Sequence, residues 1–489
     1  MTKKVCVIGA GFAGLSAACH LSRLGYDVSV VEKNATPGGR ARQLKIDGFQ
    51  YDMGPSWYWM PDVFDGFFAA FDKSTSDYYG LKRLSPSYGV KFKDELLEIP
   101  AEMEALEAMF DRIEPGSSEC LRKFLAQAKY KYEVGINDLV HKPSRSLTEF
   151  VDARLLYGLL KMDVFTSMRS HVHKFFKNDK LRQLMEFPVL FLGSTPQNTP
   201  ALYSLMNYAD MSLGTWYPDE GMYSVVKAMC KLAEELGVEF LLDHEVKEFG
   251  FEANVVTHVM TDKKDVKTDI VVAGADYHHV EQELLPAKYR KYSQAYWDKR
   301  VMAPSSLLFY LGVNKELPKM LHHLLFFDEP FDQHAHEIYE DPKWPTKPLL
   351  YTATTSKTDK AAAPAGHENL FVLIPVAPGL EDTHEIREQY YDRIMDRLEA
   401  YNGEDIRNHV VVKRSYAHKD FENDYHSFKG NAYGLANTLR QTAILKPSLK
   451  NKKLKNLYFT GQLTVPGPGV PPSLISGEVV ANEIKKDFS

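Results

Sequence analysis

The stretch Val5-Cys6-Val7-Ile8-Gly9-Ala10-Gly11-Phe12-Ala13-Gly14 lies close to the start of the 489-residue chain. Its first residues are apolar and predict a short buried strand, which a glycine-rich turn follows. Residues 15–24 have a helical pattern that Gly25 ends, and residues 28–31 predict a second strand. The sequence therefore predicts a βαβ unit whose tight turn carries the pattern Gly-x-Gly-x-x-Gly.

A turn of this kind is suited to binding a dinucleotide. Gly9 permits the tight turn, Gly11 lets a pyrophosphate approach the backbone, and Gly14 lets the helix pack closely on the strand. Glu32, at the end of the second strand, can accept hydrogen bonds from a ribose diol, and an acid there disfavours the 2′-phosphate of NADP. The unit predicts a site for FAD or NAD, with contacts from Gly9, Gly11, Phe12, Ala13, Gly14, Glu32 and Lys33.

The segment Pro37-Gly38-Gly39-Arg40-Ala41 helps to decide between FAD and NAD as the cofactor. Gly39 brings the backbone close to the ligand, and Arg40 offers a guanidinium fork to phosphate oxygens. This segment resembles the corresponding one in the amine oxidase and phytoene desaturase superfamily of flavoproteins, where it helps to hold FAD. Asp52-Met53-Gly54-Pro55-Ser56 resembles the flavin-side loop of the same superfamily. The resemblance implies FAD as the cofactor, with further contacts from Gly39, Arg40, Gly54, Pro55 and Ser56.

The middle of the chain resembles carotenoid desaturases. Residues 214–222 precede a helical pattern that runs to Leu236, and residues 238–242 are strand-like. Val246 and residues 271–276 suggest further strands that return to the nucleotide domain, and Val246 is a further expected FAD contact. Other matches follow in the family's order, at residues 193–196, His322-His323, 363–366, 430–434 and 441–443.

The C-terminal region resembles the FAD signature of bacterial phytoene desaturases. Residues 456–461 are interpreted as a strand that ends in a turn, and Pro466-Gly467-Pro468-Gly469-Val470-Pro471-Pro472 precedes a helix from about Ser473. A helix start aimed at the flavin would stabilise the negative charge of the reduced ring. The expected contacts are Gly461, Gly469, Val470 and Pro471, and the alternative is a proline-rich surface loop before an ordinary helix. Lys446-Pro447 stands where the family usually has Arg-Pro.

Together these motifs predict an α/β fold with a Rossmann-like FAD-binding domain and a second, mixed α+β substrate domain. Because the nucleotide motifs lie at the start, middle and end of the chain, the FAD domain is expected to be discontinuous. Its expected borders are 1–70, 212–285 and 428–489. The substrate domain then takes residues 71–211 and 286–427, with possible membrane-contact helices.

The resemblance implies an FAD-dependent carotenoid desaturase that acts by hydride transfer to flavin N5. A phytoene desaturase and a 1′-hydroxycarotenoid 3,4-desaturase share all of these motifs, so the carotenoid stays open. An amine oxidase and a non-catalytic lipid-binding escort protein of the same superfamily are the alternatives. The sequence has no second Gly-x-Gly-x-x-Gly for a nicotinamide, so NAD is not the expected electron partner. The resemblance implies oxygen or a quinone as the electron acceptor.

Few polar catalytic residues are expected, because an extended polyene can delocalise a developing cation. Glu149 stands about where bacterial phytoene desaturases carry an acid discussed as a proton acceptor, which makes it the candidate base. Ser146 with Glu149 three residues later is also a capping box, so a helix-start role is the alternative. Trp57 and Trp216 are candidates for the flavin face, with core packing as the alternative.

Contact with a membrane surface would suit a lipid-soluble substrate. An apolar face recurs at nearly helical spacing over Leu155, Leu156, Leu159, Leu160, Phe165, Met168, Val172 and Phe176. A helix that faces the core is the alternative. The lysines at 446, 450, 452, 453 and 455 could add attraction to anionic headgroups. We expect a cytoplasmic protein that associates peripherally with a membrane, because the sequence shows no signal-peptide core and no spanning segment of about 18 apolar residues.

Composition excludes several other classes. The net charge of −6 gives no basic footprint for nucleic acid. The four cysteines, Cys6, Cys19, Cys120 and Cys230, have no paired spacing, so neither a disulfide framework nor a zinc site is predicted. His171 with His173, and His334 with His336, have ligand-like spacing but no convincing third ligand, so no metal is expected.

Overall fold

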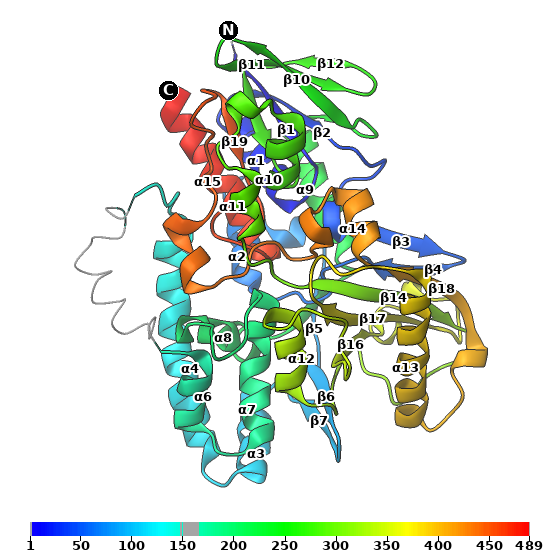
Figure 1. Ribbon diagram of the computed structural model, residues 1–489. Coiled ribbons are helices and arrows are strands. Elements are labelled where there is room, and N and C mark those ends of the chain that lie inside the picture. Colours follow the sequence, from blue (N-terminus) through cyan, green and yellow to red (C-terminus); the bar gives the residue numbers. More distant parts are fainter. Residues whose placement is uncertain (1, 147–148, 150–165, 489) are drawn as a thin grey trace.

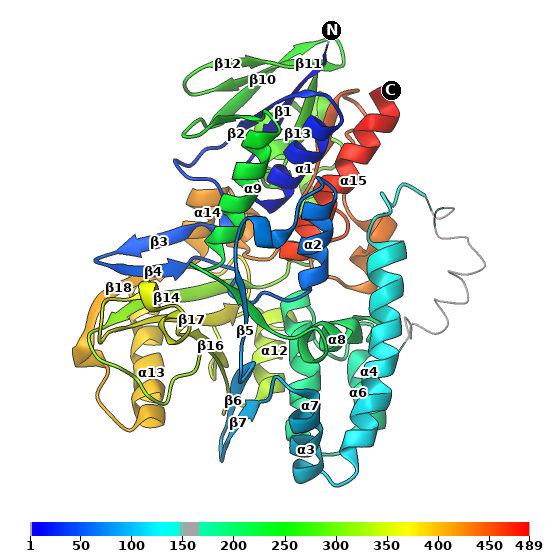
Figure 2. The same ribbon diagram turned by 180° about the vertical axis from the view of Figure 1, so that it is seen from behind.

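The computed structural model describes residues 2–146, 149 and 166–488. One end of the molecule holds a parallel sheet and its helices, together with a small antiparallel sheet that contains β10 (Val246–Glu252) and β11 (Val255–Thr261) (Figure 1). The other end holds a seven-stranded mixed sheet beside a group of long helices, as the opposite view also shows (Figure 2). The predicted α/β class is confirmed.

The parallel sheet has five strands in the order β19-β13-β1-β2-β9. Every neighbouring pair is parallel, and β1 lies in the middle with Val7 opposite both Val272 and Val30. The apolar runs that predict these strands are buried on both faces, as helix-covered parallel strands require. Strands from the start, middle and end of the chain are therefore neighbours: β1 (Lys4–Ile8), β2 (Asp27–Val31), β9 (Glu239–Leu241), β13 (Ile270–Ala273) and β19 (Leu457–Phe459).

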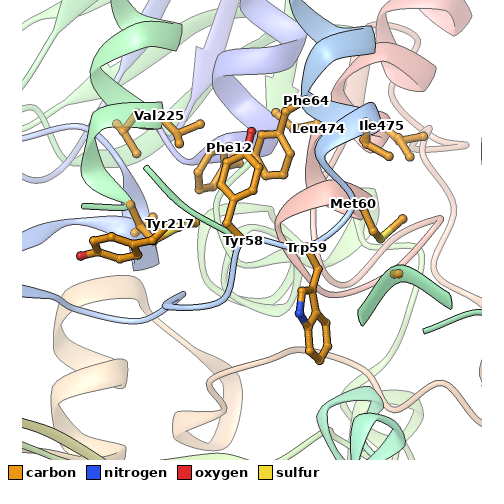
Figure 3. Packing of buried hydrophobic residues seen from close by; sticks show 14 of the residues in the cluster. Phe12, Tyr58, Trp59, Met60, Phe64, Tyr217, Val225, Leu474 and Ile475 are labelled. Atoms are coloured by element: carbon orange, nitrogen blue, oxygen red, sulfur yellow. The ribbon is translucent and has the colours of Figure 1, made fainter. Parts of the chain in front are cut away.

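Three helices pack beside this sheet: α1 (Phe12–Arg23), α9 (Tyr223–Glu235) and α15 (Val470–Phe488). α1 and α15 lie in close contact because Gly477 has no side chain, and a Cβ there would stand 2.6 Å from the Ala13 oxygen. The Ser16 hydroxyl also donates to the Leu474 oxygen at 2.6 Å. In Figure 3, Phe12 of α1 and Leu474 of α15 meet Tyr58 and Phe64 in one apolar cluster.

α15 begins at Val470, three residues before the start predicted from the sequence. Pro471 and Pro472 fall within its first turn. The N–H groups of a first turn have no partner inside the helix, so prolines are tolerated there. The prediction that both prolines belong to the preceding loop is wrong on this point.

Three small antiparallel sheets accompany the parallel one. β10 and β12 flank β11 in the first, and β10 begins at Val246. The hairpin β3–β4 ends at Asp52, directly before the predicted flavin-side loop. Their strands, with the third pair, are β10 (Val246–Glu252), β11 (Val255–Thr261), β12 (Asp265–Lys267), β3 (Gln43–Ile46), β4 (Phe49–Asp52), β5 (Leu81–Arg83) and β8 (Trp216–Pro218).

The seven-stranded sheet has the order β18-β14-β17-β16-β15-β6-β7. Only the β6–β15 pair is parallel. α13 (His384–Asn402) covers one face, where alternate residues such as Leu324 and Phe326 form an apolar core with Ile394. The strands are β6 (Tyr88–Phe92), β7 (Leu96–Ile99), β14 (Ser305–Val313), β15 (His323–Phe327), β16 (Leu350–Ala353), β17 (Glu368–Val376) and β18 (Val410–Tyr416).

The opposite face of this sheet presents Leu325, Phe327, Tyr351 and Leu373 toward the main core. Helices on that side include α12, which follows β15, and the long helix α4 (Figure 2). The other described helices are α2 (Pro61–Ala69), α3 (Met103–Ile113), α4 (Ser117–Val134), α6 (Met168–Phe175), α7 (Asp179–Glu186), α8 (Leu205–Met211), α10 (Tyr277–His279), α11 (Gln294–Asp298), α12 (Phe331–Tyr339) and α14 (His418–Tyr425).

The apolar face predicted as a candidate for membrane contact is only partly described. Its first five members, residues 155, 156, 159, 160 and 165, lie outside the described residues. Met168, Val172 and Phe176 are buried in the core, which corrects the membrane interpretation for those three. Lys446 is buried as well, so it cannot contribute to a basic surface. No helix in the described part of the chain is long and apolar enough to cross a membrane. The domain borders proposed from the sequence stay a prediction.

Candidate functional site

The turn between β1 and α1 is built around glycines. Gly9 has a φ of +96°, a conformation that L side chains rarely adopt. A Cβ on Gly14 would stand 1.9 Å from the Gly9 oxygen, and a Cβ on Gly274 would stand 3.1 Å from the Ile8 oxygen. The carboxyl ends of β1 and β13 therefore meet closely at this turn. In open parallel sheets, this edge is where ligands bind.

The predicted Gly-Gly-Arg segment lies against the turn. The Gly38 N–H donates to the Ala10 oxygen at 2.8 Å. A Cβ on Gly39 would stand 3.2 Å from the Gly11 Cα, and a Cβ on Gly54 would stand 2.5 Å from the Arg40 oxygen. The structure thus places Gly54, with its neighbours Pro55 and Ser56, beside Arg40.

The C-terminal segment reaches the same place. Gly461 has a φ of +101°, and a Cβ there would stand 3.6 Å from the Ala13 Cβ. Its N–H donates to the Ser476 hydroxyl of α15 at 3.0 Å. Gly469, Val470 and Pro471 form the start of α15. Residues from both ends of the chain are therefore brought together as the sequence predicts, while their contacts with a cofactor stay predictions.

Glu32 follows β2, and both of its carboxylate oxygens accept hydrogen bonds from the protein. Oε2 accepts from the Ala10 N–H at 2.8 Å, and Oε1 accepts from the backbone and side-chain N–H groups of Asn34, each at 2.9 Å. The backbone N–H of His244 donates to the backbone oxygen of Glu32 at 2.8 Å. This bond brings Val246, two residues further on, into this region. Lys33 points toward α14, where its amine donates to the Asn423 oxygen and lies 3.3 Å from His426 Nε2.

These residues fit FAD. The N-cap of α1 is Gly11, which has no side chain to bond the first N–H groups of the helix, so those groups can bind a phosphate. Arg40 donates to the Ser427 hydroxyl and lies 3.4 Å from the Asn431 oxygen, but its buried Nε reaches no acceptor in the described part of the chain. Burial lowers the pKa of this guanidinium, and nearby Asp276 offsets only part of that effect. An anionic cofactor would supply an acceptor for Nε and a compensating charge.

A cavity lies on the face of the seven-stranded sheet that α13 leaves uncovered. It holds about 620 Å³ of empty space, including its open mouth. Four tyrosine and histidine side chains are the polar members of an otherwise apolar wall, and none of the lining residues is Asp, Glu, Lys or Arg. The lining residues are Phe187, Leu190, Pro304, Leu325, Phe327, Phe331, His334, Ala335, Ile338, Tyr339, Leu349, Leu350, Tyr351, Leu373, Pro375 and Tyr433.

Tyr351 joins this cavity to the flavin-side loop. Its hydroxyl lies 2.9 Å from the Ser56 hydroxyl and 2.7 Å from His323 Nδ1. The Trp57 ring stacks on the His323 ring, with centroids 4.2 Å apart and planes inclined by 11°. Burial and the neighbouring His322 hold the pKa of His323 well below its usual value, so its imidazole is neutral. Trp57 thus lies at the junction of loop and cavity.

Sequence reasoning does not find the roles of Tyr351 and His323. The sequence marks His322-His323 only as a family match, and Tyr351 belongs to a strand in which every residue is buried, so no alternation points to it. The other tryptophan candidate, Trp216, donates from Nε1 to the Leu213 oxygen at 2.8 Å and does not line the cavity.

The Glu149 side chain caps the backbone N–H groups of the residues just before it. Its carboxylate accepts from the N–H groups of Ser144, Arg145 and Ser146, at 2.9, 2.8 and 3.1 Å. It is not among the residues that line the cavity. This placement favours the capping interpretation over that of a catalytic base.

The histidine pairs with ligand-like spacing take part in protein contacts. His334 lies 2.8 Å from the Pro375 oxygen and accepts from the Leu349 N–H, while His173 lies 3.3 Å from Glu186. Within the described ranges, no group of three or more His, Cys, Asp or Glu side chains could hold a metal ion.

Comparisons with known proteins agree with this geometry. The flavin-containing amine oxidoreductase family matches residues 12–485. A carotenoid 3,4-desaturase of Haloarcula japonica is 42% identical, over 99% of this chain and 98% of its own. A zeta-carotene-forming phytoene desaturase of Myxococcus xanthus is 31% identical, over 99% of this chain and 94% of its own. An oxidoreductase structure from Methanosarcina mazei has a TM-score of 0.60 at 16% identity, covers 99% and 100% of the two chains, and shows the fold alone.

Proposed function

Because the chain belongs to the flavin-containing amine oxidoreductase family, we propose that it is an FAD-dependent carotenoid desaturase. The observation that carries the proposal is the 42% identity, over 99% of this chain, to a carotenoid 3,4-desaturase. The similarity to a phytoene desaturase over the same length supports the same reaction class.

The reaction removes two hydrogens from a saturated C–C bond next to a polyene. One leaves as a hydride and the other as a proton, and the electron pair of the second C–H bond becomes the new π bond. When bound, FAD supplies the hydride acceptor, its N5 atom. The protein must hold the substrate in line with that atom, exclude water and provide a route for the proton.

The cavity suits such a substrate. Its wall is apolar, and three of its four polar side chains have protein partners: Tyr351 as described above, Tyr339, which donates to the Leu190 oxygen at 3.0 Å, and His334, which is bonded on both ring nitrogens. An extended polyene spreads a developing cation along its own chain, so no strong base is needed beside it. Tyr351, a member of this wall, is hydrogen-bonded to Ser56 of the flavin-side loop.

The same cavity argues against an amine substrate. An ammonium group buried in an apolar site needs a carboxylate or several acceptors around it. The lining residues include no Asp or Glu. An escort function is disfavoured because the chain keeps the tight glycine turn and Arg40, whose buried Nε has no acceptor among the described residues and would suit a flavin phosphate.

The finer parts of the proposal concern partners and location. Oxygen or a quinone would take the electrons, as the resemblance to carotenoid desaturases implies. A single Gly-x-Gly-x-x-Gly turn argues against a separate nicotinamide site. Peripheral contact with a membrane would give access to a substrate dissolved in lipid. The four free cysteines suit a reducing compartment such as the cytoplasm.

Reconstitution tests the function directly. The purified holoenzyme is incubated in liposomes with phytoene and, separately, with a 1′-hydroxylated carotene, and products are followed by chromatography with absorbance detection. A longer conjugated system in either product supports the proposal and identifies the substrate class. The proposal fails if neither carotenoid changes while an amine bleaches the flavin absorbance, or if the protein binds no flavin after FAD is added.

A further inference from the structure

Lys446 is a buried amine without a counter-charge. Its side chain is only 5% exposed, and its Nζ reaches no acceptor in the described part of the chain. Burial without a compensating charge lowers the pKa of this amine to about 7. Leaving a buried donor unpaired is unfavourable, so native chains rarely keep one without a partner or a ligand.

Asn437 presents an unmatched acceptor at the same point. It is 5% exposed, and its Oδ1 is buried without a donor among the described residues. Asn437 Oδ1 and Lys446 Nζ both lie close to Gly467. A Cβ on residue 467 would stand 3.1 Å from Asn437 Oδ1 and 3.3 Å from Lys446 Nζ. The two side chains do not bond to each other. Together they offer a donor next to an acceptor, at a position that a side chain on residue 467 would obstruct.

This pair lies beside the loop that leads into α15, the helix whose start is expected to face the cofactor. Gly467 lies in the loop that ends at Gly469, directly before α15 begins at Val470. The Ser476 hydroxyl of α15 accepts from the Gly461 N–H, and Gly461 stands beside Ala13 of the glycine turn. The positive end of the α15 dipole points into the same region.

We propose that Lys446 and Asn437 recognise the pyrimidine edge of the flavin ring. That edge carries a carbonyl oxygen next to the N3–H group, which is the acceptor–donor pattern that an ammonium and an amide oxygen complement. The amine then binds the carbonyl oxygen and Asn437 Oδ1 accepts from N3–H. A cation there stabilises the negative charge that this edge gains when the ring is reduced. The inference rests on the flavin of the proposed function and does not depend on the substrate.

The test uses cofactor binding and reduction, which need no carotenoid. Lys446→Met, Lys446→Arg and Asn437→Leu are compared with wild type and with Lys452→Met, a matched control at an exposed lysine of the same region. FAD affinity is measured by fluorescence titration, and the ratio of reduced to oxidised flavin is measured against a redox dye. The probes are FAD and FAD methylated at N3.

We expect Lys446→Met to weaken FAD binding about tenfold and to lower the reduced-to-oxidised ratio about tenfold, whereas Lys446→Arg retains the ratio and Lys452→Met changes neither. Wild type should bind N3-methyl FAD about tenfold more weakly than FAD, and Asn437→Leu should bind the two equally. The comparison of FAD with N3-methyl FAD in wild type needs no variant, so a folding defect cannot hide its result.

The inference is overturned if wild type binds both cofactors equally, or if Lys446→Met matches Lys452→Met in affinity and in reduced fraction. Carotenoid products from the same preparations separate the two proposals. An enzyme that desaturates without these effects contradicts the inference alone, whereas these effects without desaturation contradict the proposed function alone.

Discussion

The Tyr351 hydroxyl lies 2.9 Å from the Ser56 hydroxyl, which connects the middle of the seven-stranded sheet to the loop that follows β4. Tyr351 also lines the apolar cavity, so one side chain touches both the expected substrate space and the expected flavin side. His323 supports this contact from the neighbouring strand, at 2.7 Å from the same hydroxyl. The three residues form one hydrogen-bonded chain inside an apolar region.

Replacing Tyr351 with phenylalanine should therefore impair both stability and turnover. The change leaves His323 Nδ1 and the Ser56 hydroxyl without this partner, and a buried unpaired polar group costs about 1–3 kcal/mol of unfolding free energy. We expect turnover to fall about tenfold, because Ser56 is no longer held in position. Denaturant unfolding and initial desaturation rates measure the two effects.

Tyr390→Phe is the matched control for this prediction. The Tyr390 hydroxyl donates to the Pro345 oxygen at 2.6 Å, and Tyr390 belongs to α13 on the other face of the sheet. It should lose a similar amount of stability and keep its turnover. Equal turnover in the two variants would show that Tyr351 has only a structural role.

The sequence predicts those parts of this site that depend on residues close together in the chain. The strand, turn and helix around Gly9 follow from an apolar run and from glycine spacing. The contact between Tyr351 and Ser56 depends on the strand order, on which face of β16 Tyr351 occupies and on where the loop after β4 lies. β16 is buried throughout, so its sequence gives no alternation from which to read that face.

The burial of Lys446 could not be predicted from the sequence either. A lysine within a lysine-rich segment favours a surface position, because charged side chains are rarely buried without a partner. The structure buries it beside Gly467, which only the fold of the C-terminal loop brings about. The sequence signal that could have revealed it is the departure from the family's Arg-Pro at this position.

Gly14→Ala should disrupt the glycine turn. The new Cβ would stand 1.9 Å from the Gly9 oxygen, and backbone cannot yield as a flexible side chain can. We expect a loss of about 1–3 kcal/mol in unfolding free energy and weaker FAD binding, because α1 must move away from β1. Denaturant unfolding and FAD fluorescence titration measure both.

Gly66→Ala controls for the general effect of adding a methyl group to a helical glycine. A Cβ at Gly66 of α2 would meet nothing within 4 Å. This variant should gain about 0.5–1 kcal/mol, because alanine loses less backbone entropy than glycine in a helix. The account of the turn is wrong if Gly14→Ala is as stable as wild type and binds FAD equally well.

His322 should make stability depend on pH. Burial lowers the pKa of His322 to about 3 from 6.5, so the folded protein keeps this imidazole neutral while the unfolded chain protonates it below about pH 6.5. The unfolded state then binds more protons, and the unfolding free energy falls as pH decreases. The loss from this residue is about 2 kcal/mol between pH 7 and pH 5.

The measurement is the difference between wild type and His322→Gln in denaturant unfolding at both pH values. The variant should lose about 2 kcal/mol less than wild type over this interval, since it cannot bind the extra proton. His384→Gln, at an exposed histidine at the start of α13, should follow wild type. The same pH dependence in wild type and His322→Gln would rule out a neutral, buried imidazole at position 322.

Glu149→Gln distinguishes a cap from a catalytic base. The carboxylate accepts three backbone N–H groups of residues 144–146, which a glutamine oxygen can satisfy only in part. We expect a loss of about 0.5–2 kcal/mol in unfolding free energy with turnover unchanged, because Glu149 is not among the residues that line the cavity. A base would behave differently, since glutamine cannot take a proton: turnover would fall by about 100-fold or more and the pH profile of kcat would lose its acidic limb. The unfolding free energy reports the capping role and turnover reports the catalytic role. Measuring both therefore distinguishes a cap from a base.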